Sequence, residues 1–132
     1  MIYLDANIFL YPHSGEGPKA KACIAILKNL SENKINAFTS SLTWDEINYA
    51  LRKILGKEKA IEQSRIFLET PNLVFLKVDE ETINVAQDII EKYAINPRDA
   101  IHAATAIINK AEGIVTDDSD FDKIKELKRV KI

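Results

Sequence analysis

Four acidic side chains, far apart in the sequence, are the candidates for chemistry in this chain. They are Asp5, Glu46, Asp99 and Asp118. Gathered at one place, four carboxylates repel one another unless a cation compensates them, and a set of oxygen ligands suits Mg²⁺ or Mn²⁺ better than zinc. Such an ion keeps bound waters, one of which can attack a phosphodiester while the ion stabilises charge on the phosphate. The acidic set therefore predicts a metal site for phosphate chemistry.

Other metal and nucleotide motifs are incomplete or absent. The run from Asp118 begins like an EF-hand loop, but its sixth and twelfth positions are Lys123 and Arg129 instead of Gly and Glu. The sequence has no Cys/His cluster for zinc, no P-loop, no G-x-G-x-x-G run and no G-x-S-x-G elbow. A phosphatase of the haloacid dehalogenase type would carry Asp-x-Asp near the start, where this chain has Asn7. The acids of a response-regulator receiver are not matched either.

Composition places the chain among ordinary globular proteins. It has 132 residues, of which 46% are hydrophobic and 29% are charged, so we expect one domain spanning residues 1–132. A net charge of −2 gives no overall basic footprint for nucleic acid. A single cysteine, Cys23, excludes an intrachain disulfide, and no apolar run approaches the length of roughly 20 residues that a membrane span needs. We expect a cytoplasmic protein.

The acids must be positioned by strands and helices that alternate along the chain. Asp5 follows a short apolar strand, and in parallel sheets ligands collect beyond the carboxyl ends of the strands. We expect further strands at residues 36–39, 73–76 and 114–116, with a possible edge strand at 130–132. Helices are expected at residues 19–33, 42–55, 57–68 and 81–94 and from 97 towards 113, and a loop at 12–18. This order predicts an α/β domain with a mainly parallel sheet covered on both faces.

Helical geometry favours Glu46 over its neighbour Asp45. The apolar stripe of the 42–55 helix, expected to be buried, consists of Ile47, Ala50, Leu51 and Ile54. At about 100° per residue, Asp45 points away from that stripe and Glu46 lies on its border, from which it can reach a cleft. Both acids could instead serve only to complement the positive N-terminal end of the helix dipole.

Asp99 and His102 lie in the first turns of the helix that begins near residue 97. Asn96 is a good N-cap and Pro97 suits the first helical position, which puts Asp99 at the third. An acid there can close a capping box, so Asp99 taken alone favours a structural role. His102 is one turn further on the same face. It could orient Asp99 or contact a phosphate, although a buried helix histidine is the more ordinary interpretation; His13, in the expected loop, is interpreted as a surface residue.

Taken together, these motifs resemble those of a PIN domain. They occur in the family's order: Asp5 to Asn7, Glu46 on a helix, Arg98 to Ala100 at a helix start, and Thr116 to Phe121. The chain is similar to the single-domain members, the VapC-type toxins of toxin–antitoxin pairs. The resemblance implies a three-layer α/β/α sandwich and a Mg²⁺- or Mn²⁺-dependent endoribonuclease that leaves a 5′-phosphate and a 3′-hydroxyl.

The resemblance also assigns roles to single residues. The family pattern Thr-x-Asp-x-Asp-Phe selects Asp118 over Asp117 as the fourth acid, although Asp117 stays an alternative. It implies that Asp5, Asp99 and Asp118 hold the metal, while Glu46 binds a second ion or positions the attacking water. Supporting roles are implied for three further residues: Asn7 beside Asp5, the hydroxyl of Thr116, and Asp120 as an auxiliary acid.

An alternative function is a catalytically weak PIN-type module that binds RNA or protein in RNA processing. The presence of all four acids favours catalysis. For a toxin, the resemblance implies an RNA substrate, a small antitoxin that covers the acidic site, and a homodimer. The first long helices, with Tyr49 outside the main stripe, could supply the dimer interface, or Tyr49 could belong to the core.

Overall fold

A five-stranded sheet runs through the centre of the molecule, and all its neighbouring strands are parallel. The computed structural model describes residues 1–132. The strands are β1 (Ile2–Leu4), β2 (Ala37–Ser40), β3 (Leu73–Leu76), β4 (Ile114–Val115) and β5 (Arg129–Val130), in the spatial order β3-β2-β1-β4-β5. The N-terminal strand is therefore central: Tyr3 is in register with Phe38 on one side and Ile114 on the other. The expected parallel α/β sheet is confirmed.

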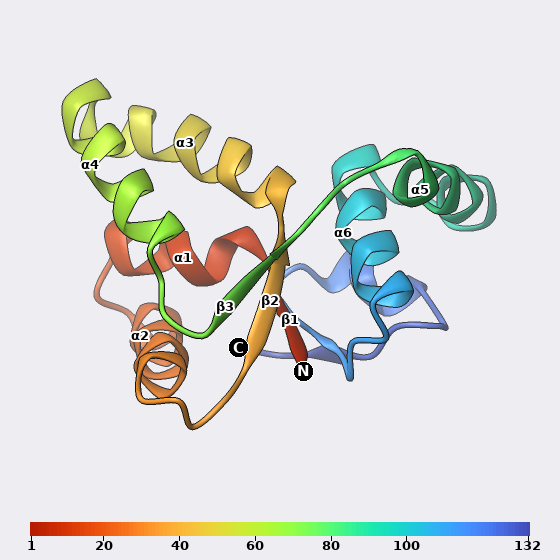
Figure 1. The fold of residues 1–132 in the computed structure, drawn as a ribbon, viewed down its shortest axis with the longest axis horizontal. Coiled ribbons are helices and arrows are strands. Elements are labelled where there is room, and N and C mark those ends of the chain that lie inside the picture. Colours follow the sequence, from red (N-terminus) through yellow and green to blue (C-terminus); the bar gives the residue numbers. More distant parts are fainter.

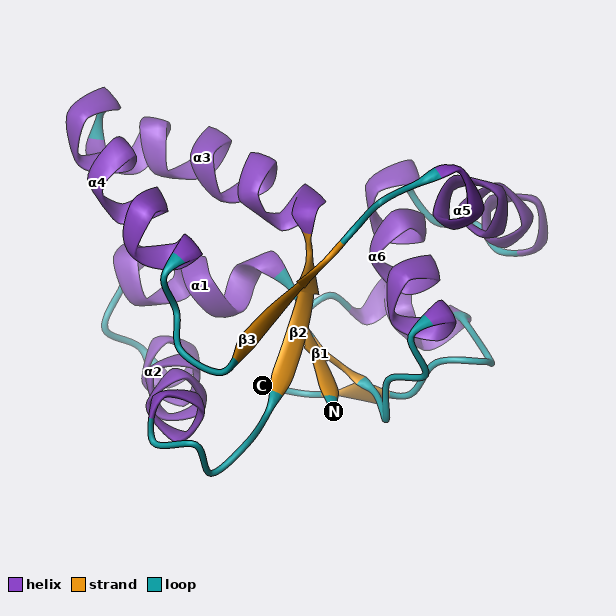
Figure 2. Cartoon of the chain, viewed as in Figure 1, coloured by secondary structure: helices purple, strands orange, loops and turns teal.

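Helices cover both faces of this sheet (Figure 1). On one side lie α1 (Ala6–Ser14), α2 (Pro18–Ser31), α3 (Ser41–Leu55) and α4 (Lys57–Leu68). On the other lie α5 (Glu80–Lys92) and α6 (Pro97–Ile108), and Figure 2 shows the strands as a thin layer between the two groups. A short 3₁₀ helix, η1 (Ser119–Lys123), follows β4. The three-layer α/β/α arrangement is that expected of the PIN-like sandwich.

Every helix is too short or too polar to cross a bilayer.

The alternation of side chains along the strands divides the core into two. Leu4 and Ala37 belong to the cluster beneath α1–α4, whereas Tyr3 and Phe38 belong to the cluster beneath α5 and α6. Successive strand residues point to opposite faces, which explains the division. Tyr3 is completely buried, so its hydroxyl lies within the layer between β1 and α6.

Two expectations about local structure were wrong. Residues 12–14, expected in a loop, continue α1 with Pro12 inside the helix. Proline removes one backbone donor there, but the helix ends two residues later, and Ile8 and Phe9 anchor it in the core. Ile54, assigned to the buried stripe of α3, is 44% exposed. Its exposure follows from the way the α3–α4 hairpin extends beyond the sheet (Figure 1).

Candidate active site

The acidic residues lie at the carboxyl edge of the sheet, where β1 and β4 end and α3 and α6 begin (Figure 1). Asp5 follows β1 and is the N-cap of α1, its Oδ1 accepting the amide proton of Ala6 at 2.7 Å. Thr116 follows β4 and donates its hydroxyl to Asp5 Oδ2 at 2.7 Å. Asp5 is only 7% exposed, so both carboxylate oxygens are fixed at the rim of the core.

The hydroxyl of Thr116 links the first and fourth predicted acids. Besides donating to Asp5, its Oγ1 accepts the amide N–H of Asp118 at 3.1 Å. The side-chain amide of Asn7 lies 3.4 Å from both Asp5 Oδ2 and Thr116 Oγ1. Asn7 and Thr116 thus both lie within hydrogen-bonding distance of Asp5, and their supporting role in the site stays a prediction. The other Asn7 atom, Oδ1, is buried without a hydrogen-bond partner.

Glu46 reaches the site from the first turns of α3. Ser40 caps this helix by accepting the amide proton of Leu42 at 2.9 Å. The Glu46 side chain is 21% exposed and lies against His102, whereas Asp45 is exposed on the other side of the helix. The structure thus brings Glu46 to the acidic set and leaves Asp45 outside it, as the helical geometry predicted.

Asp99 lies beside Asp118 and Asp120. One oxygen from each of the three carboxylates lies within 4.8 Å of the others. Burial, followed by the charges of Asp118 and Asp5, raises the pKa of Asp99 to about 6. Helix α6 begins at Pro97 after Asn96, as expected, but Asn96 makes no side-chain cap hydrogen bond and α6 has no capping box. The capping role considered for Asp99 is therefore wrong, because its carboxylate lies with the other acids.

His102 is completely buried between β1, α3 and α6. Its Nδ1 is 2.5 Å from the hydroxyl of Tyr3, and its Nε2 contacts Glu46 Oε1 and lies 3.7 Å from Asp5 Oδ1. Burial lowers the pKa of His102. The hydrogen bond to Glu46 and the charge of Asp5 together raise it by more, so the pKa lies above its ordinary value. The sequence-based idea that His102 orients Asp99 is replaced by a direct contact with Glu46.

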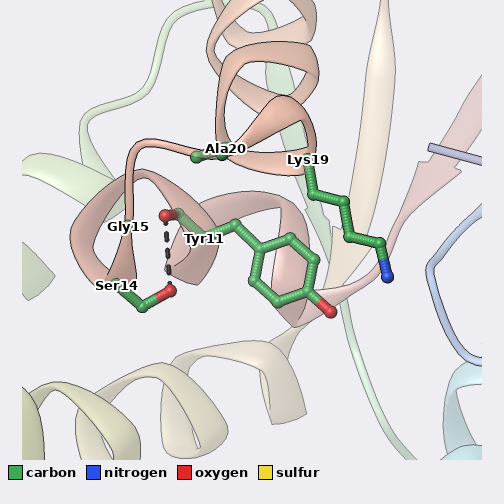
Figure 3. Close-up of a pocket in the computed structure, with 6 residues that line it drawn as sticks. Tyr11, Ser14, Gly15, Lys19 and Ala20 are labelled. Carbon is green, nitrogen blue, oxygen red and sulfur yellow. Dashed lines mark hydrogen bonds between the residues drawn. The ribbon is translucent and has the colours of Figure 1, made fainter.

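Two residues from α1 and α2 hold Asp117 away from this set. Its Oδ2 accepts hydrogen bonds from the hydroxyl of Tyr11 at 2.7 Å and from Lys19 Nζ at 2.8 Å. Figure 3 shows these two side chains extending in the same direction from α1 and α2. Lys19 and Tyr11 keep the pKa of Asp117 below its usual value. Asp117 is therefore turned towards Tyr11 and Lys19, whereas Asp118 lies with Asp99 and Asp120.

A cavity of about 260 Å³ opens over three of the four predicted acids. Asp5, Glu46 and Asp99 line it, together with Arg98 and Tyr49. Neither Arg98 nor Tyr49 was predicted as a site residue, although each had a sequence signal: Arg98 adjoins Asp99, and Tyr49 lies three positions after Glu46 on the same helix face. Tyr49 is 60% exposed, so the second of the two interpretations considered for it, a place in the core, is wrong. His13 is not among the residues that line this cavity.

A family model described as the PIN domain matches residues 2–127. The chain belongs to the PIN-domain family. Among curated proteins it is similar to Ribonuclease VapC2 of Methanocaldococcus jannaschii, with 22% identity over 99% of this chain and 93% of that protein.

Solved structures show the same PIN fold. VapBC2 from Rickettsia felis, bound to a DNA fragment from its promoter, is 23% identical, with a TM-score of 0.78 over 100% of this chain and 99% of that chain. VapC20 from Mycobacterium tuberculosis, described as a toxin that cleaves the sarcin–ricin loop, is 17% identical, with a TM-score of 0.76 over 97% of this chain and 99% of that chain. At these identities the likeness shows a shared fold.

Proposed function

We propose that this PIN-domain protein is a metal-dependent endoribonuclease and the toxin of a toxin–antitoxin pair. The observation that carries the proposal is the arrangement of the four acids at one edge of a parallel sheet: Asp5, Glu46 and Asp99 line an open cavity, and Asp118 lies beside Asp99. The likeness to a protein named as a ribonuclease and to one described as an RNA-cleaving toxin supports RNA as the substrate.

The residues present fit a divalent metal ion. Two groups of side chains each bring their ligand atoms within 4.8 Å of one another: Asp99 with Asp118 and Asp120, and Asp5 with Glu46 and His102. Their carboxylates are oxygen ligands of the kind that Mg²⁺ and Mn²⁺ prefer. The buried and unpaired Asn7 Oδ1 beside Asp5 adds an acceptor that a metal-bound water can satisfy. The raised pKa of Asp99 also fits, because crowded carboxylates gain most from a nearby cation.

When bound, the metal would stabilise charge on the phosphate and make a coordinated water more acidic. The side chains hold the geometry: the Ala6 N–H and the Thr116 hydroxyl fix Asp5, and Glu46 would hold the attacking water or a second ion. Arg98, in the cavity lining, offers a positive charge to the RNA backbone. The water oxygen bonds to phosphorus as the bond to O3′ breaks, and a proton passes to O3′. The products are a 5′-phosphate and a 3′-hydroxyl.

The proposed partners are an RNA, a small antitoxin and a second copy of the chain, all inside the cell. Apolar side chains exposed on α3 and α4 offer a surface for a protein partner: Trp44 is 45% exposed, Ile61 60% and Ile66 54%. Light scattering during gel filtration tests the homodimer. A monomer of about 14.9 kDa at micromolar concentration would contradict it.

The nuclease is tested by cleavage of a labelled, structured RNA with Mg²⁺, with Mn²⁺ and with EDTA. The wild type should cut only with metal, Asp118→Asn should not cut, and Asp117→Asn should retain cleavage. Melting temperatures of all three proteins show whether any loss reflects unfolding. If folded wild type cuts none of several RNAs, the alternative of a PIN-type binding module gains support, and filter binding of the same RNAs would test it.

A further inference from the structure

Two buried residues that belong to none of the predicted ligand positions connect the core to Glu46. Tyr3 on β1 and His102 on α6 are both completely buried. The Tyr3 hydroxyl is 2.5 Å from His102 Nδ1, and Nε2, the ring's other nitrogen, contacts Glu46 Oε1. Three elements that lie far apart in the sequence thus meet through one imidazole ring.

The protonation of the ring follows from its neighbours. Nε2 faces carboxylate oxygens of Glu46 and Asp5, which only accept hydrogen bonds when ionised. Nε2 therefore carries a proton in either charge state of the ring and donates it to Glu46. In the neutral ring Nδ1 is the acceptor, and the Tyr3 hydroxyl donates to it. Both ring nitrogens have protein partners in this structure, in which Nε2 lies within 4.8 Å of carboxylate oxygens of both Asp5 and Glu46.

The Glu46 carboxylate depends on this one contact, whereas that of Asp5 has several hydrogen-bond donors. Asp5 is held by the amide of Ala6 and the hydroxyl of Thr116, whereas the hydrogen bond to the Glu46 carboxylate comes from His102. A glutamate side chain loses much rotamer freedom when it is fixed, so an unsupported Glu46 would sample several positions. The contact engages Oε1 and leaves Oε2 for the site.

We infer that His102, backed by Tyr3, is a positioning residue that fixes the Glu46 carboxylate at the edge of the acidic site. The inference rests on the proposed nuclease function for its kinetic readout. Residues that orient an active-site ligand from behind typically contribute about 10–100-fold to metal affinity or activity. Replacing His102 should therefore lower kcat within that range, while KM for RNA, which is set by contacts elsewhere, changes little.

The first experiment compares three substitutions in α6. His102→Leu removes both ring nitrogens and should reduce kcat about 10–100-fold. His102→Gln places an amide donor near the position of Nε2 and should recover most of the rate. Thr105→Val is the matched control, because Thr105 is equally buried on the same helix but bonds only to the carbonyl of Ile101. It should keep the wild-type kcat, and a uniform loss in all three would indicate general damage to α6 and overturn the inference.

A double-mutant cycle separates positioning from a general structural role. If His102 acts only through Glu46, then His102→Leu should cost nothing further in a Glu46→Gln background. If His102→Leu lowers kcat in the Glu46→Gln background as much as it does in the wild type, the inference is overturned. Tyr3→Phe, which touches none of the acids, should give a smaller fall in kcat, and that fall should also vanish in the Glu46→Gln background.

Crystal structures make the inference testable without activity. Glu46 should leave its position in His102→Leu and keep it in His102→Gln. If wild type cuts no RNA, the proposed function fails while these structures still decide the positioning role. An unmoved Glu46 in His102→Leu would overturn the inference even if the nuclease is real.

Discussion

Asp99→Asn should stabilise the metal-free protein while abolishing its activity. Burial and the neighbouring carboxylates of Asp118 and Asp5 raise the pKa of Asp99 from 3.8 to about 6, which means that its charged form destabilises the fold. A pKa difference of about 2.2 corresponds to about 3 kcal/mol at 1.36 kcal/mol for each pKa unit. Asparagine has the same shape and removes that charge.

Two effects reduce this upper figure. The Asp99 side chain is only about half buried, so solvent screens part of the repulsion. A carboxylate in the first turn of α6 also gains about 0.3–1 kcal/mol from the helix dipole, and the variant loses that gain. We therefore expect a net increase of about 1–2 kcal/mol in the free energy of unfolding, or roughly 3–10 °C in Tm.

The gain should depend on pH in a defined direction. Because the folded-state pKa is the higher one, the folded protein binds the Asp99 proton more tightly than the unfolded chain does. The destabilisation is absent well below pH 3.8, grows between about pH 4 and 6, and is complete above that window. About a third of the full advantage of Asp99→Asn should remain at pH 4.5.

The assay is thermal unfolding in EDTA at pH 4.5 and pH 7.5. Asp88→Asn on α5 is the matched control, because it removes one exposed negative charge away from the site. Saturating Mg²⁺ should then stabilise wild type by about 2.7 kcal/mol at 100 times Kd and the variant by less. An Asp99→Asn protein that is less stable than wild type at pH 7.5, or whose advantage is larger at pH 4.5, would refute the reasoning.

Three further substitutions test the framework of the site. Thr116→Val loses the donor to Asp5 and should cost about 1–3 kcal/mol of stability and about 10–100-fold in RNA cleavage, whereas Thr116→Ser should keep both. Phe121→Ala truncates a fully buried ring and should lower the free energy of unfolding, measured in urea, by about 3–5 kcal/mol. Gly113→Ala would put a Cβ 2.8 Å from a backbone oxygen and should lower Tm by overpacking worth about 1–3 kcal/mol, while Gly15→Ala, with open space around it, should not.

The strands and helices followed from local patterns, whereas side-chain pairings did not. The alternation of strands and helices gave the parallel sheet, and the position of Glu46 on the border of its stripe placed it correctly at the site. The contacts of Asp117 could not be foreseen, because Tyr11 and Lys19 lie about a hundred residues earlier and meet it only through packing. The partner of His102 was missed for the same reason, since Glu46 is on another helix 56 positions away.

The burial of residues on a helix face was predicted less well where the helix extends to the edge of the molecule. Ile54 has the right spacing for the buried stripe of α3, but periodicity only identifies a face and does not say where the partner layer stops. The same limit applied to Tyr49, whose exposure depends on how α3 extends beside the cavity. How far a helix extends beyond the layer that it covers depends on the packing of the whole domain, which the local sequence pattern does not contain.

The central position of β1 has a consequence for how the protein is made. Tyr3 pairs with Ile114, so the contact that brings Asp5 to Asp118 closes a loop of more than a hundred residues. Such non-local pairing forms slowly compared with local helices. During synthesis Asp5 emerges early, but the Thr116 hydroxyl that fixes its Oδ2 is absent until β4 has been made. A truncated product that stops before β4 lacks Thr116 and Asp118 altogether. Incomplete chains are therefore unable to assemble the acidic site, and a growing polypeptide would leave the RNA around it uncut.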